Sequence, residues 1–291
     1  MTSVVVWRER ELIDGEALRA EWDDHPAIAP ANPWMHVGDI WLAADTRISA
    51  GTPSGTRTVS TDAALKILPI TLELYQERED GGPGTIIVYT GELAYAWAGS
   101  MLPATATYAM VSSYLKRLTG PAFTELPTMD ALADLVNRIG TKYAADTRQP
   151  FEAFLVGTSP QSNGQGEDAA YRLRFDRTGF PRSIEKLDLE PSGSFALLGS
   201  RQQEISATIE QGLRDDVEYV PALAVKDVIT ADADAAMVGD IGGYLNLARV
   251  SRGAVEIYPE WRNPKAGLPR AYSDDEVGQV GEWRVTGILE R

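Results

Sequence analysis

The sequence contains no cysteine and only two histidines among its 291 residues. The lack of cysteine excludes disulfides, thiol nucleophiles and cysteine-ligated zinc. The chain also lacks the glycine-rich phosphate loop, a strand-linked dinucleotide loop, the HExxH pair of zinc peptidases and the GxSxG of serine hydrolases. For imidazole chemistry only His25 and His36 remain, and a Ser-His-Asp triad built on His36 is a weak alternative. We therefore expect chemistry that needs neither a metal nor a cofactor.

Positive charge is scarce as well, with 27 Lys and Arg against 42 Asp and Glu and a formal net charge of −15. Nucleic-acid binding needs clustered positive charge, so no nucleic-acid partner is expected. No basic amphipathic stretch, membrane-spanning run or targeting signal is found, and we expect a cytoplasmic protein with no membrane partner. A hydrophobic fraction of 44% is enough for a core. The simplest organisation is one domain over 1–291, with an insertion at about 9–36 and a C-terminal extension from about 260.

Hydrophobic periodicity predicts blocks of strands that alternate with pairs of helices. Such an order favours an α+β fold in which sheets pack face to face with helices outside, and it disfavours parallel βαβ units. The segment 46–61 is rich in Gly, Ser and Thr and predicts a turn. The expected strands are 2–7, 37–45, 65–74, 85–90, 93–98, 151–156, 170–175, 194–198, 243–250, 254–258 and 283–289; the expected helices begin near 101, 129, 202 and 221. The helical period of the first extends to Leu118 with Pro103 in its first turn, and Thr128 is the expected cap of the second.

Thr2 is the first candidate for chemistry. An initiator Met that precedes a small residue is normally removed, and Thr2 would then carry a hydroxyl nucleophile and a free amine on one residue. An α-amino group has a pKa of about 7.7–8.0, so it can accept the hydroxyl proton near neutral pH. Many proteins begin Met-Thr without catalytic consequence, so this signal is weak alone.

Four further segments strengthen the case for Thr2 as a nucleophile. They are LAADTR at 42–47, Lys66-Ile67, AYAWAGS at 94–100 leading into a helix, and Leu198-Gly199-Ser200 before another helix. In this order, together with the TSVVV start, they resemble the proteasome β-subunit type of N-terminal-nucleophile (Ntn) hydrolase. The likeness is to a divergent bacterial branch similar to ancestral β-subunits. It covers nearly the whole chain and implies a four-layer αββα sandwich of two antiparallel sheets flanked by helices.

The resemblance also implies catalytic roles. Thr2 would be the nucleophile that forms an acyl-enzyme with an amide substrate. Asp45 would hold Lys66, and Lys66 would lower the pKa of the Thr2 amine and hydroxyl. The backbone N–H of Gly99 would donate to the oxyanion. A lysine that faces a sheet interior needs a carboxylate partner, and Asp45 on a neighbouring strand is a candidate on that ground alone.

Arg47 and Ser200 would orient the terminus, and Asp240 is the nearest candidate for the acidic residue that the family places beside the nucleophile. The chain departs from the family in spacing. Residues 9–36 separate Thr2 from Asp45, and an extra hairpin around 81–84 lengthens the stretch before Gly99. Loops of this kind are tolerated because closure entropy grows slowly with length.

We therefore predict an N-terminal threonine peptidase that acts on peptides or unfolded proteins and assembles as a homo-oligomeric ring. Two alternatives stay open. One is a catalytically inactive proteasome-like ring or scaffold subunit, in which Asp45 and Lys66 form an ordinary structural ion pair. The other is an amidase for small molecules, which the sequence does not separate from a peptidase.

Overall fold

A five-stranded antiparallel sheet contains the N-terminal strand at its second position. The computed structural model describes residues 2–9, 38–51, 57–61, 64–80, 82, 84–122, 125–160, 166–178, 183–189, 193–216, 219–234, 241–258, 260–262, 279–280, 283–284 and 288–290. The β-branched run Val4–Val6 is fully buried in this sheet, which explains its strand. The strand order is β11 (Phe195–Gly199), β1 (Ser3–Arg8), β2 (Ile40–Asp45), β12 (Leu245–Ser251) and β13 (Ala254–Tyr258).

A six-stranded sheet forms the second layer. Its order is β10 (Ser183–Lys186), β9 (Asp168–Phe175), β8 (Phe151–Thr158), β6 (Thr85–Gly99), β5 (Ile67–Glu77) and β7 (Leu118–Gly120). Neighbouring strands are antiparallel except for β5 and β7, which run parallel. Three small two-stranded sheets pair β3 (Ile48–Gly51) with β4 (Arg57–Thr61), β14 (Glu260–Arg262) with β17 (Ile288–Glu290), and β15 (Gln279–Val280) with β16 (Trp283–Arg284).

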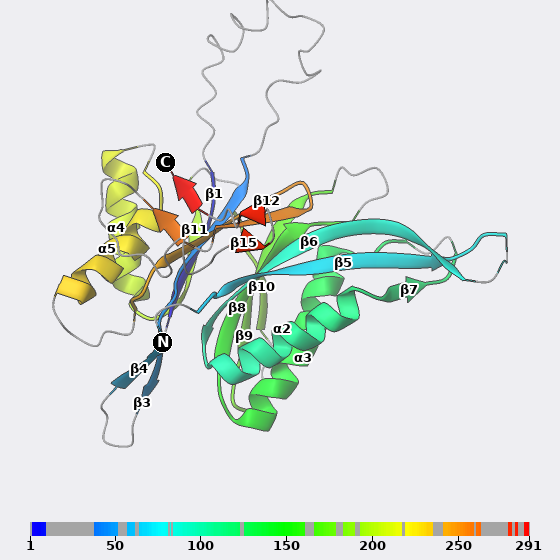
Figure 1. The fold of residues 1–291 in the computed structure, drawn as a ribbon, viewed down its shortest axis with the longest axis horizontal. Helices are drawn as coiled ribbons and strands as arrows, with labels where there is room; N and C mark the ends of the chain where they lie inside the picture. Colours follow the sequence, from blue (N-terminus) through cyan, green and yellow to red (C-terminus); the bar gives the residue numbers. More distant parts are fainter. Residues whose placement is uncertain are drawn as a thin grey trace, which may run out of the picture.

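Helices cover the outer face of each large sheet (Figure 1). The helices α2 (Met101–Leu115) and α3 (Met129–Thr147) pack on the six-stranded sheet, and α4 (Gln202–Asp215) and α5 (Ala222–Asp234) pack on the five-stranded sheet. As expected, α2 begins at Met101 with Pro103 in its first turn, and the Thr128 hydroxyl caps α3 by accepting from the Ala131 N–H at 3.2 Å.

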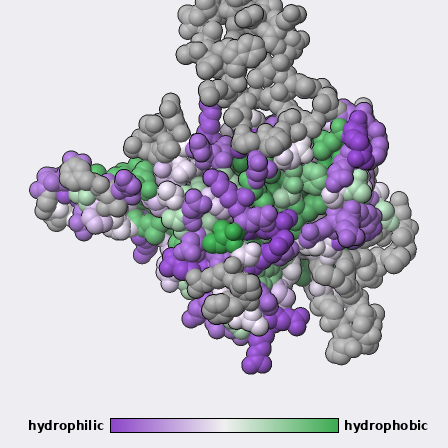
Figure 2. Space-filling model, turned by 180° about the vertical axis from the view of Figure 1, so that it is seen from behind, coloured by the Kyte–Doolittle hydropathy of each residue, from purple (hydrophilic) through white to green (hydrophobic). Residues whose placement is uncertain are grey.

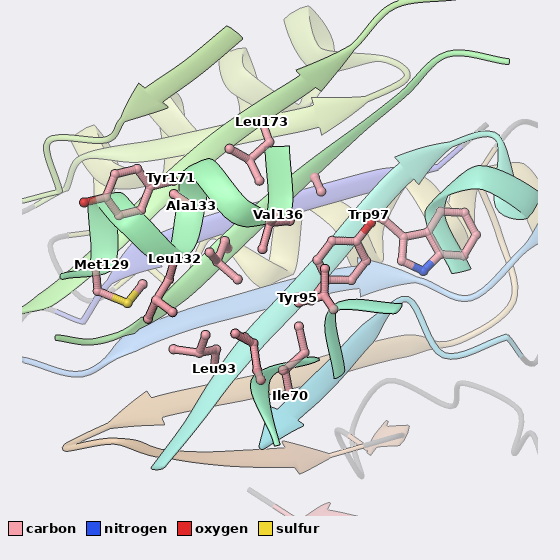
Figure 3. Close-up of a cluster of buried hydrophobic side chains, with 14 of the residues drawn as sticks. Ile70, Leu93, Tyr95, Trp97, Met129, Leu132, Ala133, Val136, Tyr171 and Leu173 are labelled. Atoms are coloured by element: carbon pink, nitrogen blue, oxygen red, sulfur yellow. The ribbon is translucent and has the colours of Figure 1, made fainter. Parts of the chain in front are cut away.

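The β6 strand shows how the layers pack. Its large residues Tyr95 and Trp97 join the cluster that also contains side chains of α3 (Figure 3), whereas Ala94, Ala96 and Ala98 lie in the cluster between the two sheets. Small side chains on the inner face let the sheets approach, and large ones on the outer face fill the space under the helices. The four-layer αββα sandwich predicted from the sequence is thus confirmed. Among the described residues of the two large sheets, only the β5–β7 pair departs from antiparallel pairing.

Three local expectations were wrong. The strands expected at 85–90 and 93–98 form the single strand β6, because Gly91 and Glu92 pair with Leu72 and Thr71 of β5 without a break. The helix expected to reach Leu118 ends at Leu115, and Leu118 instead pairs with Leu74. Part of the turn expected at 46–61 forms β3 and β4, and β10 was not foreseen.

The expected insertion joins two adjacent strands. Arg8 pairs with Ile40 in the β1–β2 register, and the Glu9 N–H donates to the Asp39 carbonyl at 2.9 Å. The chain therefore leaves and re-enters the sheet at neighbouring points, so an insertion here leaves the strand pairing intact. Residues 10–37 and most of the extension beyond 262 lie outside the described residues, and the single-domain organisation stays a prediction.

Candidate functional site

Thr2 immediately precedes β1 and is buried, with 2% of its surface exposed. The Thr2 carbonyl accepts a hydrogen bond from the Ser200 N–H at 2.8 Å. The Ser3 hydroxyl donates to the Ser200 carbonyl at 2.6 Å, and Ser3 lies opposite Gly199 in the β1–β11 register. These bonds fix the backbone on both sides of the Thr2–Ser3 peptide.

The Asp45 carboxylate, fully buried at the end of β2, collects four donors. Its Oδ1 accepts from the Ser3 N–H at 2.9 Å and from the Lys66 ammonium at 3.1 Å. Its Oδ2 accepts from the Arg47 and Gly242 N–H groups, each at 3.2 Å. One side chain thus ties together the start of β1, the end of β2, the start of β5 and the chain ahead of β12.

Burial raises the pKa of Asp45 above its ordinary value of 3.8, because the ionised form loses its hydration. The Lys66 ammonium and the N–H groups of Ser3 and Gly242 oppose this shift by stabilising the carboxylate. A buried charge pair is expensive to keep, and perturbed carboxyl groups of this kind are concentrated at functional sites.

Lys66 is fully buried and immediately precedes β5. Its ammonium donates to Asp45 and to the carbonyl of Arg47, while its own carbonyl accepts from the Trp97 N–H at 3.1 Å. The structure therefore brings Asp45 and Lys66 into the contact that the sequence suggested. Because the Ser3 N and the Lys66 Nζ contact the same carboxylate oxygen, they are at most about 6 Å apart.

Gly99 is exposed at the end of β6, two residues beyond Trp97, with φ of +100°. A Cβ at this position would lie 3.0 Å from the Cα of Phe151 and 3.1 Å from the Pro150 carbonyl oxygen, so both the dihedral angle and the space favour glycine. The next residue, Ser100, precedes α2.

Gly199 lies against Thr2. With φ of +88°, a Cβ on Gly199 would fall 1.6 Å from the Thr2 carbonyl oxygen and 3.1 Å from the Cβ of Ala98. The ends of β6 and β11 thus meet beside the first residues of β1. The Ser200 hydroxyl is buried there, and it has no hydrogen-bond partner among the described residues.

Of the two remaining candidate site residues, Arg47 lies in the described part of the chain and Asp240 does not. Arg47 supports the site through its backbone, and its side chain donates to the Ile241 carbonyl at 3.5 Å. Asp240 lies outside the described residues. Two positions later, Gly242 binds Asp45, and its carbonyl accepts from the Thr46 and Arg47 N–H groups at 3.2 and 3.0 Å. The described residues thus bring together Thr2, Asp45, Lys66, Arg47 and Ser200.

Sequence reasoning missed Asn246, a fully buried residue of β12. Its Oδ1 accepts from the Ile67 N–H at 3.2 Å, and its Nδ2 donates to the Tyr258 carbonyl at 3.3 Å. The side chain thereby joins the five-stranded sheet to the residue that follows Lys66. Only the polar identity of Asn246 between Leu245 and Leu247 could have drawn attention to it.

The described residues contain no group of three or more His, Cys, Asp or Glu side chains placed to hold a metal ion. Within the same part of the chain, none of the helices combines the length and the apolar character needed to cross a membrane.

The chain is similar in structure to known proteins, but no family model or curated protein matches its sequence. A chain of the helical assembly of the Anbu complex from Pseudomonas aeruginosa superposes with a TM-score of 0.51 at 13% identity, covering 88% of this chain and 85% of that chain. Anbu, an ancestral beta-subunit, from Yersinia bercovieri gives 0.47 at 11% identity, covering 85% and 81%. A mutant of Anbu from Hyphomicrobium sp. strain MC1 gives 0.49 at 13% identity, covering 86% and 81%.

The match to the Pseudomonas aeruginosa protein spans most of both chains and shows a shared fold. The chain has the Ntn-hydrolase fold. At 13% identity this likeness concerns the fold alone, so the roles of the residues rest on the geometry given above.

Proposed function

We propose that the chain is an N-terminal threonine amidohydrolase, a peptidase that acts through an acyl-enzyme on Thr2 after removal of Met1. One observation carries the proposal. A single oxygen of a buried carboxylate, Oδ1 of Asp45, binds both the Lys66 ammonium and the N–H of Ser3, the residue after Thr2. This contact keeps the Lys66 ammonium at most about 6 Å from the Ser3 nitrogen, which is bonded to the carbonyl carbon of Thr2.

The cation has a chemical use at that distance. A positive charge near an amine favours its neutral form, so Lys66 would lower the pKa of a free Thr2 amine and keep it able to accept a proton. Asp45 orients the Lys66 ammonium, whose Nζ lies 3.1 Å from Oδ1 of Asp45. The negative charge of the Asp45 carboxylate balances the positive charge of the Lys66 ammonium. The site therefore keeps a fixed positive group without burying an unpaired charge.

The proposed reaction forms an ester on Thr2 and then hydrolyses it. The Thr2 hydroxyl oxygen attacks the amide carbonyl while its proton passes to the Thr2 amine. That proton then moves to the leaving nitrogen, the C–N bond breaks, and an ester on Thr2 remains. Water attacks the ester and gives one proton to the amine. The amine returns this proton to the threonine oxygen as the carboxylic acid leaves.

Gly99 is the proposed oxyanion donor. It is exposed at the end of β6, and the neighbouring Ala98 lies against Gly199, which in turn contacts Thr2. A backbone N–H held by a strand end needs no reorganisation as charge develops on the oxygen, which makes it an effective donor. Ser200 would hold the Thr2 carbonyl in place, and Arg47 would support the Lys66 ammonium through its carbonyl oxygen.

A catalytically silent subunit is the second candidate, and burial favours it. Thr2 is 2% exposed, and Asp45 and Lys66 are fully buried in the chain that carries Met1. A site closed in this way would serve structure alone unless removal of Met1 opens it to substrate. The two candidates therefore differ in whether a chain that starts at Thr2 turns over an amide.

The test compares three chains released from a cleavable N-terminal fusion: one that starts at Thr2, one with a single glycine ahead of Thr2, and Thr2→Ala. Each is mixed with fluorogenic peptide amides and with small-molecule amides, and product release is followed. We expect turnover only by the chain that starts at Thr2, and the same chain with Ser113→Ala, which removes an exposed hydroxyl on α2, should retain it. Turnover by Thr2→Ala or by the blocked chain would contradict the mechanism. A folded but inactive Thr2-first chain would favour the silent subunit.

Assembly is a further part of the proposal. The structural neighbour from Pseudomonas aeruginosa is described as a helical assembly of a complex. Together with the ring expected from the family resemblance, this supports a homo-oligomer as the working form of the chain, acting on peptides or unfolded proteins.

A further inference from the structure

The free edge of β11 carries backbone groups that lack a hydrogen-bond partner. The Ser200 N–H points toward β1, where it donates to the Thr2 carbonyl. Because backbone groups alternate in direction along a strand, Phe195 and Leu197 direct theirs away from β1, the only strand that pairs with β11 among the described residues. Arg172 donates to the Leu197 carbonyl. The Leu197 N–H and both backbone groups of Phe195 have no partner in the described part of the chain.

The Leu197 N–H is unpaired although Leu197 is only 5% exposed. Backbone donors held away from water are nearly always paired in folded proteins, because an unpaired one loses its hydration without compensation. The unpaired Phe195 carbonyl lies two residues earlier on the same edge. In a parallel ladder, a carbonyl and an N–H spaced in this way bond the N–H and the carbonyl of one residue of the neighbouring strand. The edge of β11 is therefore suited to an added parallel strand.

This edge opens into a groove between β10, β11 and α4. The groove has a volume of about 770 Å³, within the range of ligand-binding clefts, and Phe195 and Leu197 line it. β10 and β11 are the outermost strands of their sheets, so the groove lies where both sheets end. Seen from behind, apolar surface extends across the middle of the molecule between hydrophilic side chains (Figure 2). The groove thus combines free backbone groups with an apolar lining.

The two walls of the groove differ in polarity. Leu187 and Ala196 pack against the apolar cluster between the two sheets and are only partly buried, so the groove exposes the edge of that cluster. The opposite wall is α4, which contributes Gln203, Ser206 and Glu210. Successive side chains of an extended chain point to opposite faces. A strand added to β11 would therefore place every second side chain on the apolar wall and the others toward α4.

Charge selects the side chains that face α4. The groove is lined by three carboxylates, those of Glu185, Asp188 and Glu210, against the two cations Arg172 and Lys186. Arg172 already pairs with Glu185 at 3.5 Å. Glu210 accepts only from the hydroxyl of a neighbour on α4 and has no ion pair among the described residues. In a chain with a net charge of −15, a basic side chain would be attracted to this wall and an acidic one repelled.

We propose that the groove binds an extended peptide segment of another protein as an added strand, parallel to β11. One residue of the segment bonds the Phe195 carbonyl and the Leu197 N–H, and its apolar side chain lies beside Ala196 on the apolar wall. Its neighbours place neutral or basic side chains toward α4. A folded sheet edge of a second copy fits less well, because its own flanking elements would meet α4 and β10, whereas a single strand takes up only about 5 Å beside β11. This inference does not depend on catalysis by Thr2.

The probe is an end-capped, fluorescein-labelled octapeptide in which valine alternates with lysine or threonine. Its binding to the full-length protein is measured by fluorescence anisotropy. Methylation of the valine nitrogens removes the donor to the Phe195 carbonyl and should weaken binding by about tenfold or more. Methylation of the lysine and threonine nitrogens, which point away from β11, is the matched control and should change the affinity by less than about threefold. Glutamate in place of lysine should weaken binding.

Variants of α4 test the place of binding. Ser206→Trp fills the groove and should weaken binding by about tenfold or more, whereas Ala207→Trp, at an exposed position of the same helix outside the groove, should leave it unchanged. Glu210→Lys should weaken binding of the lysine-containing probe, and Glu204→Lys, on α4 but outside the groove, is its control. This second pair decides the test if Ser206→Trp fails to fold. Amide hydrogen exchange at Leu197 should slow when the probe binds.

Four results of these experiments would overturn the proposal. They are no binding of the probe at about 1 mM, equal affinity of the two methylated probes, equal losses in a variant of the groove and its control, and unchanged exchange at Leu197. A wild-type oligomer that Ser206→Trp dissociates and Ala207→Trp does not would overturn it as well, because a second copy would then fill the groove.

Discussion

Removal of the Lys66 charge is the perturbation whose consequence the structure defines best. In Lys66→Met the Asp45 carboxylate loses the ammonium at 3.1 Å and keeps three backbone donors, those of Ser3, Arg47 and Gly242. Both charged side chains are fully buried, so water cannot replace the lost partner. Breaking a buried pair in this way costs about 3–5 kcal/mol of unfolding free energy. Removing both charges, as in Asp45→Asn with Lys66→Met, should cost about 2 kcal/mol less than the single change.

The protonation of Asp45 should also make the unfolding free energy depend on pH. Burial raises the folded-state pKa of Asp45 above 3.8, so between that value and the folded pKa the folded chain binds more protons than the unfolded chain. The unfolding free energy therefore falls as pH rises through this window. Loss of the ammonium raises the pKa of Asp45 further and widens the window. Lys66→Met should thus recover part of its lost stability as the pH is lowered from 7.5 toward the raised pKa of Asp45.

Urea unfolding, followed by the fluorescence of the seven tryptophans, measures both effects at one protein concentration. A loss below about 1 kcal/mol for Lys66→Met at pH 7.5 would refute the reasoning, because it would mean that Asp45 is not charged or that water reaches it. A double variant no more stable than the single variant would refute it equally.

Two further substitutions test the frame around Thr2 and Lys66. Gly199→Ala should lower the unfolding free energy by about 3 kcal/mol or more, because it combines a strained φ with a Cβ 1.6 Å from the Thr2 carbonyl oxygen. Gly84→Ala, also at positive φ but with nothing within 4 Å, is its control, and equal losses would show that the contact with Thr2 is unimportant. Asn246→Leu leaves the Ile67 N–H without its acceptor and should cost about 1–3 kcal/mol. Amide hydrogen exchange should show faster exchange at Ile67, and unchanged protection there would count against this role of Asn246.

Local sequence patterns were sufficient to predict most of the strands and helices. The β-branched start of β1, the helical periodicity of α3 and the Thr128 cap act over a few residues, so a sequence contains them directly. The proximity of Asp45 and Lys66 was suggested by a buried lysine's need for a partner and by the family resemblance, and the structure places the two side chains in contact.

The missed features depend on contacts between distant segments. Gly91 suggested a break in a strand, yet β6 continues because β5 supplies partners on both sides of Gly91, from Thr85 to Ala96. Leu118 fits a helical period but joins β7 through pairing with Leu74. Gly242 and Asn246 bind the site through backbone and amide groups from segments about 180 to 200 residues away, for which no local pattern exists.

The central claim is that Thr2 becomes a free N-terminal nucleophile beside the Asp45–Lys66 pair. The intact mass of the untagged protein, purified after expression and combined with N-terminal sequencing, tests it most directly. The account predicts a chain that has lost Met1 and begins at Thr2, with its amine free. A chain that retains Met1 would leave that amine in a peptide bond and would contradict the proposed activity.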